Sequence, residues 1–181
     1  MRLSEIADRL AALEGRDADE IHIRLRNPLF KGLLRGESGR SRNSPADYPA
    51  MELIRARLLM AMFDCGLSTA ELALVGDMLN RRIGKSDASG ALVETNPLEM
   101  MADGTAAGES WIILIRFVRG MQGERIVSPS FFKDGSDPLG ECTVRELVSD
   151  GRWSTQFSGT HMMTSVVPAS ELIRPLLESL K

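Results

Sequence analysis

The feature that most constrains the fold is a long apolar segment in the first half of the chain. Residues 50–65 read AMELIRARLLMAMFDC, and their apolar positions recur at the three- and four-residue spacing of an α-helix. Gly66 is a typical residue to end such a helix, and Ser68 is a typical cap for a following one. The pattern predicts a helix that buries one broad face, with Arg55 and Arg57 projecting away from it.

The preceding residues predict two further helices. An apolar stripe at helical spacing runs through residues 3–13. A second, shorter helix can begin near Asp17 or Asp19. Its apolar residues alternate over 21–25, a pattern that also fits a strand, so periodicity leaves both structures open. Pro28 disfavours helical geometry in the residue before it and should end or kink this element.

The charge of the chain is unevenly distributed. The whole sequence has a formal net charge of −3, yet residues 22–57 contain eight basic against three acidic residues. Residues 86–181 contain eight basic against thirteen acidic residues. A basic region ahead of an acidic remainder suits a two-part regulator, although chance variation in surface charge is an alternative. The eight basic residues are Arg24, Arg26, Lys31, Arg35, Arg40, Arg42, Arg55 and Arg57.

A change of pattern separates the two halves. Residues 82–108 are small, polar and rich in glycine, which predicts a linker. Beyond them the periodicity favours strands, strongest at 110–118, and the chain closes with a helix over 170–180 that Pro175 should kink. We expect a small α+β domain with three to five strands. The weaker strand candidates are 125–132, 142–148 and 162–167.

Several short motifs resemble those of a known family. Leu25-Arg26 precedes Gly32-Leu33-Leu34, Arg40 and Arg42 follow in a Gly- and Ser-rich loop, and Gly66-Leu67-Ser68 stands at the helix break with Glu71-Leu72 after it. In this order and spacing, residues 1–80 resemble the DNA-binding domain of MerR-like winged helix-turn-helix transcriptional regulators. The chain departs from that family in three ways. Asn27-Pro28 replaces an aromatic pair, no long helix follows residue 82 to form a coiled coil, and the effector cysteines of metal-sensing members are absent.

The expected fold is therefore α+β: a mostly helical winged helix-turn-helix domain followed by a small α+β domain. We divide the chain into a DNA-binding domain over 1–82, a linker over 83–108, and a dimerisation or effector-sensing domain over 109–181. The resemblance implies a sequence-specific regulator that binds double-stranded DNA as a homodimer. A cytoplasmic location is expected from the two unpaired cysteines and the lack of an apolar leader segment. The dimer interface is expected at residues 110–118 or in the 172–180 helix.

The basic residues are the expected DNA-binding site. Arg24 and Arg26 are the first candidates for contacts to base edges or phosphates in the major groove, and Arg40 and Arg42 would hold flanking phosphates from the wing. Lys31, Arg35, Arg55 and Arg57 are further candidates. The alternative for each is an ion pair on the protein's own surface, which we expect for about half of them. The acidic partners for such pairs are Asp17, Asp19 and Glu20.

No pattern in the sequence favours an enzyme. The chain has no P-loop, GxGxxG, GxSxG or HExxH motif, and no cofactor is expected. Cys65 and Cys142 are far apart and without a CxxC partner, so neither a zinc site nor a disulfide framework is predicted. No apolar run approaches the length of a membrane span. The rival hypothesis is a protein-interaction module, an adaptor or phage-type accessory factor whose winged helix binds no DNA.

The aromatic residues of the second half raise one more hypothesis. Both tryptophans, Trp111 and Trp153, lie there with most of the phenylalanines. One interpretation is that they form the core of a small domain. The other is that some of them line an apolar cavity for a small-molecule effector, with Arg116 and His161 as polar contacts.

Overall fold

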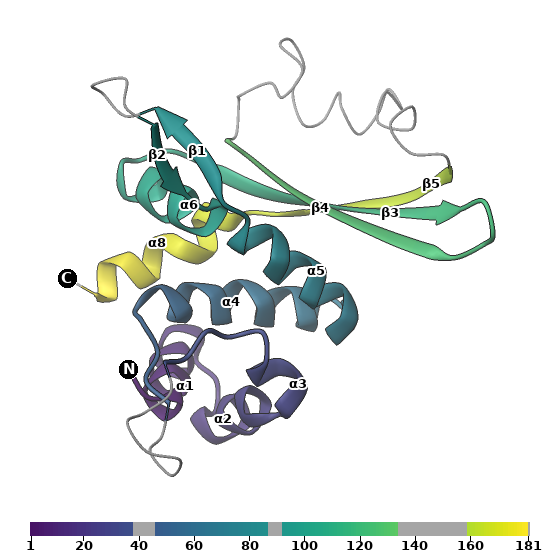
Figure 1. The fold of residues 1–181 in the computed structure, drawn as a ribbon. Coiled ribbons are helices and arrows are strands. Elements are labelled where there is room, and N and C mark those ends of the chain that lie inside the picture. The colour runs from purple at the N-terminus through teal and green to yellow at the C-terminus, as the bar shows by residue number, and fades with distance from the viewer. Residues whose placement is uncertain (38–45, 87–91, 134–158, 181) are drawn as a thin grey trace.

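A computed structural model describes residues 1–37, 46–86, 92–133 and 159–180 of the chain (Figure 1). Five helices come first and form the lower part of the view, and most of the β-structure follows above them. The α+β class predicted from the sequence is confirmed. The helices are α1 (Leu3–Glu14), α2 (Ala18–Arg26), α3 (Pro28–Lys31), α4 (Met51–Asp64) and α5 (Thr69–Asn80).

Local sequence signals explain where these helices begin and end. Gly15 and Gly66 adopt positive φ angles of 63° and 94°, which only glycine reaches without strain, and they follow the ends of α1 and α4. The side chain of Asp17 accepts a hydrogen bond from the backbone N–H of Asp19 and caps α2, which confirms the helical alternative for this segment. Ser68 and Glu71 form a reciprocal capping box at the start of α5, so the cap predicted there is also confirmed.

Helix α4 lies at the centre of the molecule, between α1–α3 on one side and α5 and α8 on the other (Figure 1). Residues 52–60 and Met62 are all buried. The expectation of one buried face was therefore wrong. The C-terminal half packs on the other side of α4, which was expected to face solvent. A helix surrounded by protein in this way has to bury its polar residues too.

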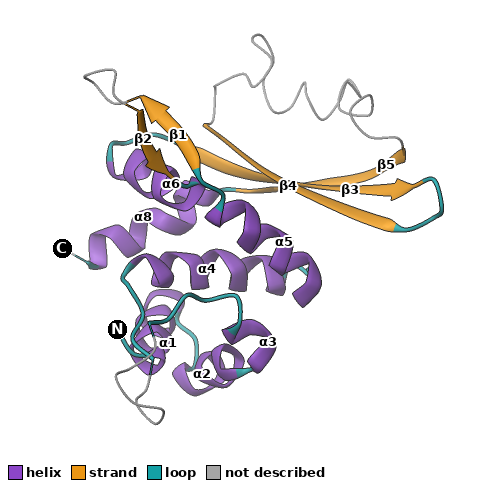
Figure 2. Cartoon of the chain, in the orientation of Figure 1, coloured by secondary structure: helices purple, strands orange, loops and turns teal. Residues whose placement is uncertain are grey.

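Among the described residues, the C-terminal half contains a hairpin, a three-stranded sheet and two helices (Figure 2). The sequence predicted strands at these three segments, and the structure confirms them: β3 is central, with β4 and β5 antiparallel on either side. The candidate strand at 142–148 lies outside the described residues. The elements are β1 (Ile83–Ser86), β2 (Leu92–Thr95), α6 (Pro97–Ala106), β3 (Trp111–Gly120), β4 (Arg125–Lys133), β5 (Gly159–Val167) and α8 (Ala169–Ser179).

The segment 83–108, expected to be a linker, is structured. It contains the β1–β2 hairpin and α6, and the side chains of Leu98 and Met101 are fully buried in the same hydrophobic cluster as those of α1 and α4. The many small residues of this segment allow close packing, which composition alone does not distinguish from a loop. None of the described helices is long and apolar enough to cross a membrane.

Both segments expected to form a dimer interface are occupied within the chain itself. Strand β3 pairs with a neighbour on each edge, so residues 110–118 offer no free edge to a second copy. Helix α8 continues through Pro175, and its Ile173 and Leu176 are fully buried against the core. Apolar periodicity predicts burial without indicating which surface covers it, so these segments serve the packing of the chain itself, and the place of a dimer contact stays a prediction.

A buried polar junction joins α6, β3 and α8. The hydroxyl group of Ser170 accepts a hydrogen bond from the backbone N–H of Trp111 at 2.8 Å and lies 2.7 Å from Thr105 Oγ1. It also lies 3.2 Å from the backbone carbonyl of Glu109, to which it can donate. Ser170 and Thr105 are only 2% and 4% exposed, so this junction satisfies polar groups that would otherwise be costly to bury.

Two glycines provide a matched test of this packing. A β-carbon on Gly104 would lie well inside contact distance of the Trp111 indole nitrogen, which Glu109 and a stacked Phe131 hold in place. We expect Gly104→Ala to lower the free energy of unfolding by about 1–3 kcal/mol. Gly76 in α5 has open space around the same position, so Gly76→Ala should raise it by about 0.5–1 kcal/mol. Urea denaturation measures both, and equal effects would contradict the packing described.

Candidate nucleic-acid interface

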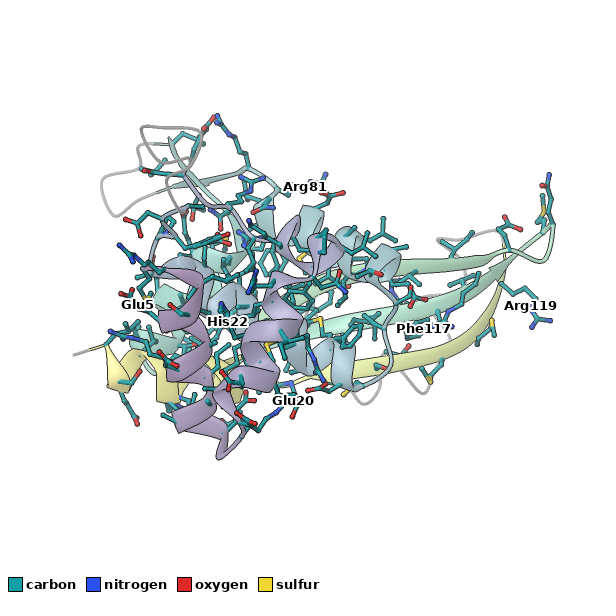
Figure 3. The ribbon with its side chains drawn as sticks, turned by 90° about the horizontal axis from the view of Figure 1, so that it is seen from below. Glu5, Glu20, His22, Arg81, Phe117 and Arg119 are labelled. Carbon is teal, nitrogen blue, oxygen red and sulfur yellow. The ribbon has the colours of Figure 1, made fainter. Side chains whose placement is uncertain are left out.

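Helix α2 presents a distinct outer face to solvent. Ile21 and Leu25 are four residues apart and fully buried against the other helices. The opposite side therefore carries His22, Ile23 and Arg26, with Ile23 72% exposed. Figure 3 views the molecule from this side, with α1 and α2 nearest the viewer and His22 between them.

The outer face of α2 borders a hollow that we call the basic cleft. Its volume is about 270 Å³, and none of the residues that line it is acidic. Leu3 and Ser4 belong to the first turn of α1, so the positive end of that helix dipole also faces the cleft. Arginine, lysine and histidine side chains from three separate segments converge here, which favours an anion. The lining residues are Arg2, Leu3, Ser4, His22, Arg26, Lys31, Ala46 and Tyr48.

Backbone pairing holds one wall of the basic cleft in place. Glu37 and Asp47 form an antiparallel bridge at the base of segment 38–45. The backbone N–H of Tyr48 donates to the carbonyl of Met1 at 2.7 Å, which fixes this base against the start of α1. The Met1 ammonium group also hydrogen-bonds Asp47 and lowers the pKa of its carboxyl group, so the charge of this acid is compensated.

Arg24, predicted to contact DNA, is held by the protein itself. Its guanidinium group pairs with Asp64 at the end of α4 and with Glu20, and it lies 5.3 Å from the centre of the Phe63 ring. Arg16 joins the same two carboxylates, at 2.9 Å from Asp64 and 3.0 Å from Glu20. This ion-pair network docks α2 on α4. The expected self-pairing of some arginines is confirmed for Arg24.

Arg55 and Arg57 lie in the interior, where DNA cannot reach them. Arg55 is 3% exposed, and its Nε donates to Glu52 at 3.0 Å; burial lowers the pKa of its guanidinium group, and Glu52 partly offsets this. Arg57 is 9% exposed, and burial likewise lowers its pKa against the opposing effect of Glu14. Their inclusion among the DNA contacts was wrong because α4 is covered on all sides.

The remaining predicted residues divide into two groups. Arg26, Lys31 and Arg35 are exposed, and none of them has an ion pair within the described residues. The backbone N–H of Arg35 donates to the buried carboxylate of Glu52 at 2.9 Å, which anchors the chain just after α3. The wing residues Arg40 and Arg42 lie in the segment outside the described residues.

The predicted effector site is not assembled in the described residues. Trp111 and Arg116 are five residues apart on one regular strand, so their side chains point to opposite faces of the sheet and cannot line one cavity. Trp111 belongs to the hydrophobic core beneath the sheet. Trp153 lies outside the described residues, and His161 is placed only by its backbone pairing with Val118.

Sequence reasoning missed Arg2 and Tyr48, which line the basic cleft. Tyr48 lies on the far side of the loop from α2, and only the folded chain brings Arg2 beside Arg26. A helical projection of α2 places Ile23 opposite Ile21 and Leu25, so the exposure of Ile23 could have been predicted from the sequence. Among the described residues, no cluster of His, Cys, Asp and Glu side chains is arranged to hold a metal ion.

Replacing one buried and one exposed basic residue should distinguish a structural role from a surface role. Arg57 Nη1 donates to the backbone carbonyl of Leu172 at 2.6 Å, and Nε lies 3.3 Å from Glu14. Arg57→Ala removes the hydrogen bond to Leu172 and the ion pair with Glu14, so we expect the free energy of unfolding to fall by about 2–3 kcal/mol. Lys31→Ala on the exposed face should change it by less than about 0.5 kcal/mol. Chemical denaturation of both variants measures the difference, and an unaffected Arg57→Ala variant contradicts the structural role.

Comparison of the chain with protein-family models, with curated proteins and with solved structures finds no match. The functional interpretation that follows therefore depends on the residues and geometry of the outer face of α2 and the basic cleft.

Proposed function

We propose that this protein is a sequence-specific regulator that binds double-stranded DNA through the outer face of α2 and the basic cleft. The observation that carries the proposal is the position of Arg26. It lies on the exposed face of a helix, has no ion pair within the described residues, and lines a cleft without acidic groups. An unpaired guanidinium group in this setting is suited to a phosphate or to the acceptor edge of guanine.

The dimensions of α2 fit a major groove. An α-helix with its side chains is about 10–12 Å across, close to the groove width of about 12 Å. Asp19 and Arg26 lie at opposite ends of the outer face, about 10 Å apart at the helical rise per residue. The acidic end would avoid phosphates while the basic end and the cleft hold them. This arrangement orients the helix in the groove.

The order of elements supports a winged helix-turn-helix interpretation. Helices α1 and α2 are followed by a loop that the Glu37–Asp47 bridge closes, and then by the α4–α5 pair. In the MerR-like regulators that the sequence resembles, the corresponding loop is the wing, and Arg40 and Arg42 would contact phosphates from it. Helix α5 ends at Asn80 and leads into β1, so a dimer needs a contact other than the long helix of that family.

A protein-interaction module is the second candidate function. Two large apolar side chains on or near the same face, Ile23 and Leu29, are 72% and 66% exposed. Exposed apolar groups of this size commonly contact a protein partner. Salt dependence distinguishes the candidates: duplex affinity that falls steeply with salt supports DNA binding, and no duplex binding at low salt supports the protein module.

The first test is a change of Arg26 after a random-duplex selection has identified the bound site. We expect Arg26→Ala to weaken specific binding by about 1–3 kcal/mol and to relax sequence choice at one position. Lys31→Ala should weaken all duplexes similarly and reduce the salt slope by about one. Arg119→Ala is the matched control, because Arg119 is an exposed arginine at the far end of the sheet (Figure 3). If Arg26→Ala and Lys31→Ala both behave like this control, the basic cleft is not the interface.

We also propose that the regulator is a homodimer that reads paired half-sites. In the described part of the sheet β5 is an edge strand, and its Met162, Met163 and Val166 are about half exposed. A second copy could pair along this edge. Val166→Lys should therefore produce monomers in light scattering at micromolar concentration, while Leu92→Lys on exposed β2 should not. A parent protein that is already monomeric contradicts the proposal.

A further inference from the structure

Ile23 is a large apolar residue on the otherwise polar and charged outer face of α2. Its side chain is 72% exposed in the middle of the outer face of α2, between polar and charged neighbours. Within the described residues, no ring contact or apolar packing explains an isoleucine at this position, since the buried side of α2 is formed by Ile21 and Leu25. An exposed isoleucine also contributes nothing to phosphate binding, which the surrounding cations supply.

We infer that Ile23 recognises the C5-methyl group of a thymine, so that the bound site contains a thymine contacted by this side chain. The inference rests on the proposed function, and it specifies part of the sequence that the protein would select. Among the groups that base pairs present in the major groove, the thymine methyl is the apolar one. An apolar side chain carried into that groove by a helix has this group as its complementary partner.

The spacing along α2 gives the position of that thymine. Ile23 and Arg26 are three residues apart on the same face, which corresponds to about 4.5 Å along the helix axis. Successive base pairs are separated by about 3.4 Å. The thymine should therefore lie on a base pair next to, or one step beyond, the base or phosphate that Arg26 contacts.

The charge of the surroundings favours a nucleic acid over a protein partner. His22 and Arg26 adjoin Ile23 on the helix face, and both line the basic cleft with Arg2 and Lys31. An apolar docking site for a protein normally consists of a larger contiguous patch with charged groups depleted at its centre. Here the exposed apolar side chains are Ile23 on α2 and Leu29 on α3, and charged residues flank Ile23, with Asp19 and Glu20 one turn before it and Arg26 one turn after it. Two apolar side chains among charged residues are fewer than such a patch needs, whereas a nucleic acid offers single methyl groups in its major groove.

The test replaces thymine by deoxyuridine, one position at a time, in a duplex selected by the full-length protein. This substitution removes only the methyl group and keeps base pairing. We expect one position at which the change weakens the parent protein by about threefold to tenfold, as loss of one buried methyl contact should. Ile23→Ala should bind the thymine duplex as weakly as the parent binds the deoxyuridine duplex, and should not respond to the substitution. Leu74→Ala, which removes a 44% exposed leucine from α5, is the matched control.

Each alternative outcome has a definite meaning. If the parent binds duplexes selectively but no thymine-to-deoxyuridine change affects it, the role of Ile23 is overturned while the proposed function stands. The same conclusion follows if Ile23→Ala weakens every duplex equally and still responds to the substitution. If the parent binds no duplex at low salt, both proposals are overturned, and Ile23 with Leu29 becomes a protein contact.

Discussion

The burial of helix α4 over residues 52–60 and at Met62 is the constraint on which the rest of the structure depends. Its apolar residues contact α1 on one side and the C-terminal elements on the other, so the two halves of the chain share one hydrophobic cluster. An enclosed helix cannot leave its charges unpaired. Glu52 therefore takes hydrogen bonds from Arg55 and from the backbone of Arg35, and Arg57 contacts Glu14 and the carbonyl of Leu172. These contacts connect α1, the segment after α3 and α8 through a single helix.

The same constraint separates the arginines into two kinds. Arg55 and Arg57 are used to complete the interior, and Arg24 is used to fix α2 on α4 through Asp64. Arg26 and Lys31 remain on the surface without such partners among the described residues. The sequence showed a surplus of positive charge over 22–57, but three of its eight basic residues, Arg24, Arg55 and Arg57, are engaged within the protein. The part left over is concentrated at the basic cleft, which explains how a chain with a net charge of −3 presents a cationic surface.

Most of the secondary structure was predictable from the sequence, because its signals are local. The cap at Ser68, the positive-φ glycine at 66 and the continuous apolar run of β3 each act within a few positions. The errors arose where a tertiary contact decides the outcome. Periodicity marked α4 and α8 as apolar but did not show that they cover one another. Nothing local distinguishes the buried Arg55 from the exposed Arg26, and nothing local places Arg2 across the cleft from Lys31.

The contacts of α4 also have a geometric consequence for the proposed DNA complex. The first turn of α1 lines the basic cleft, and Glu14 at its other end contacts Arg57, which in turn binds the backbone of α8 at Leu172. Helices and buried contacts, with no extended linker, therefore connect the cleft to the C-terminal half. If a second copy docks through β5, this continuous path sets the distance between the two clefts. DNA half-sites lie about 34–36 Å apart or at multiples of that distance. The spacing of the half-sites would then follow from the packing of α1, α4 and α8, and a substitution in that packing would alter spacing preference before it altered the choice of bases.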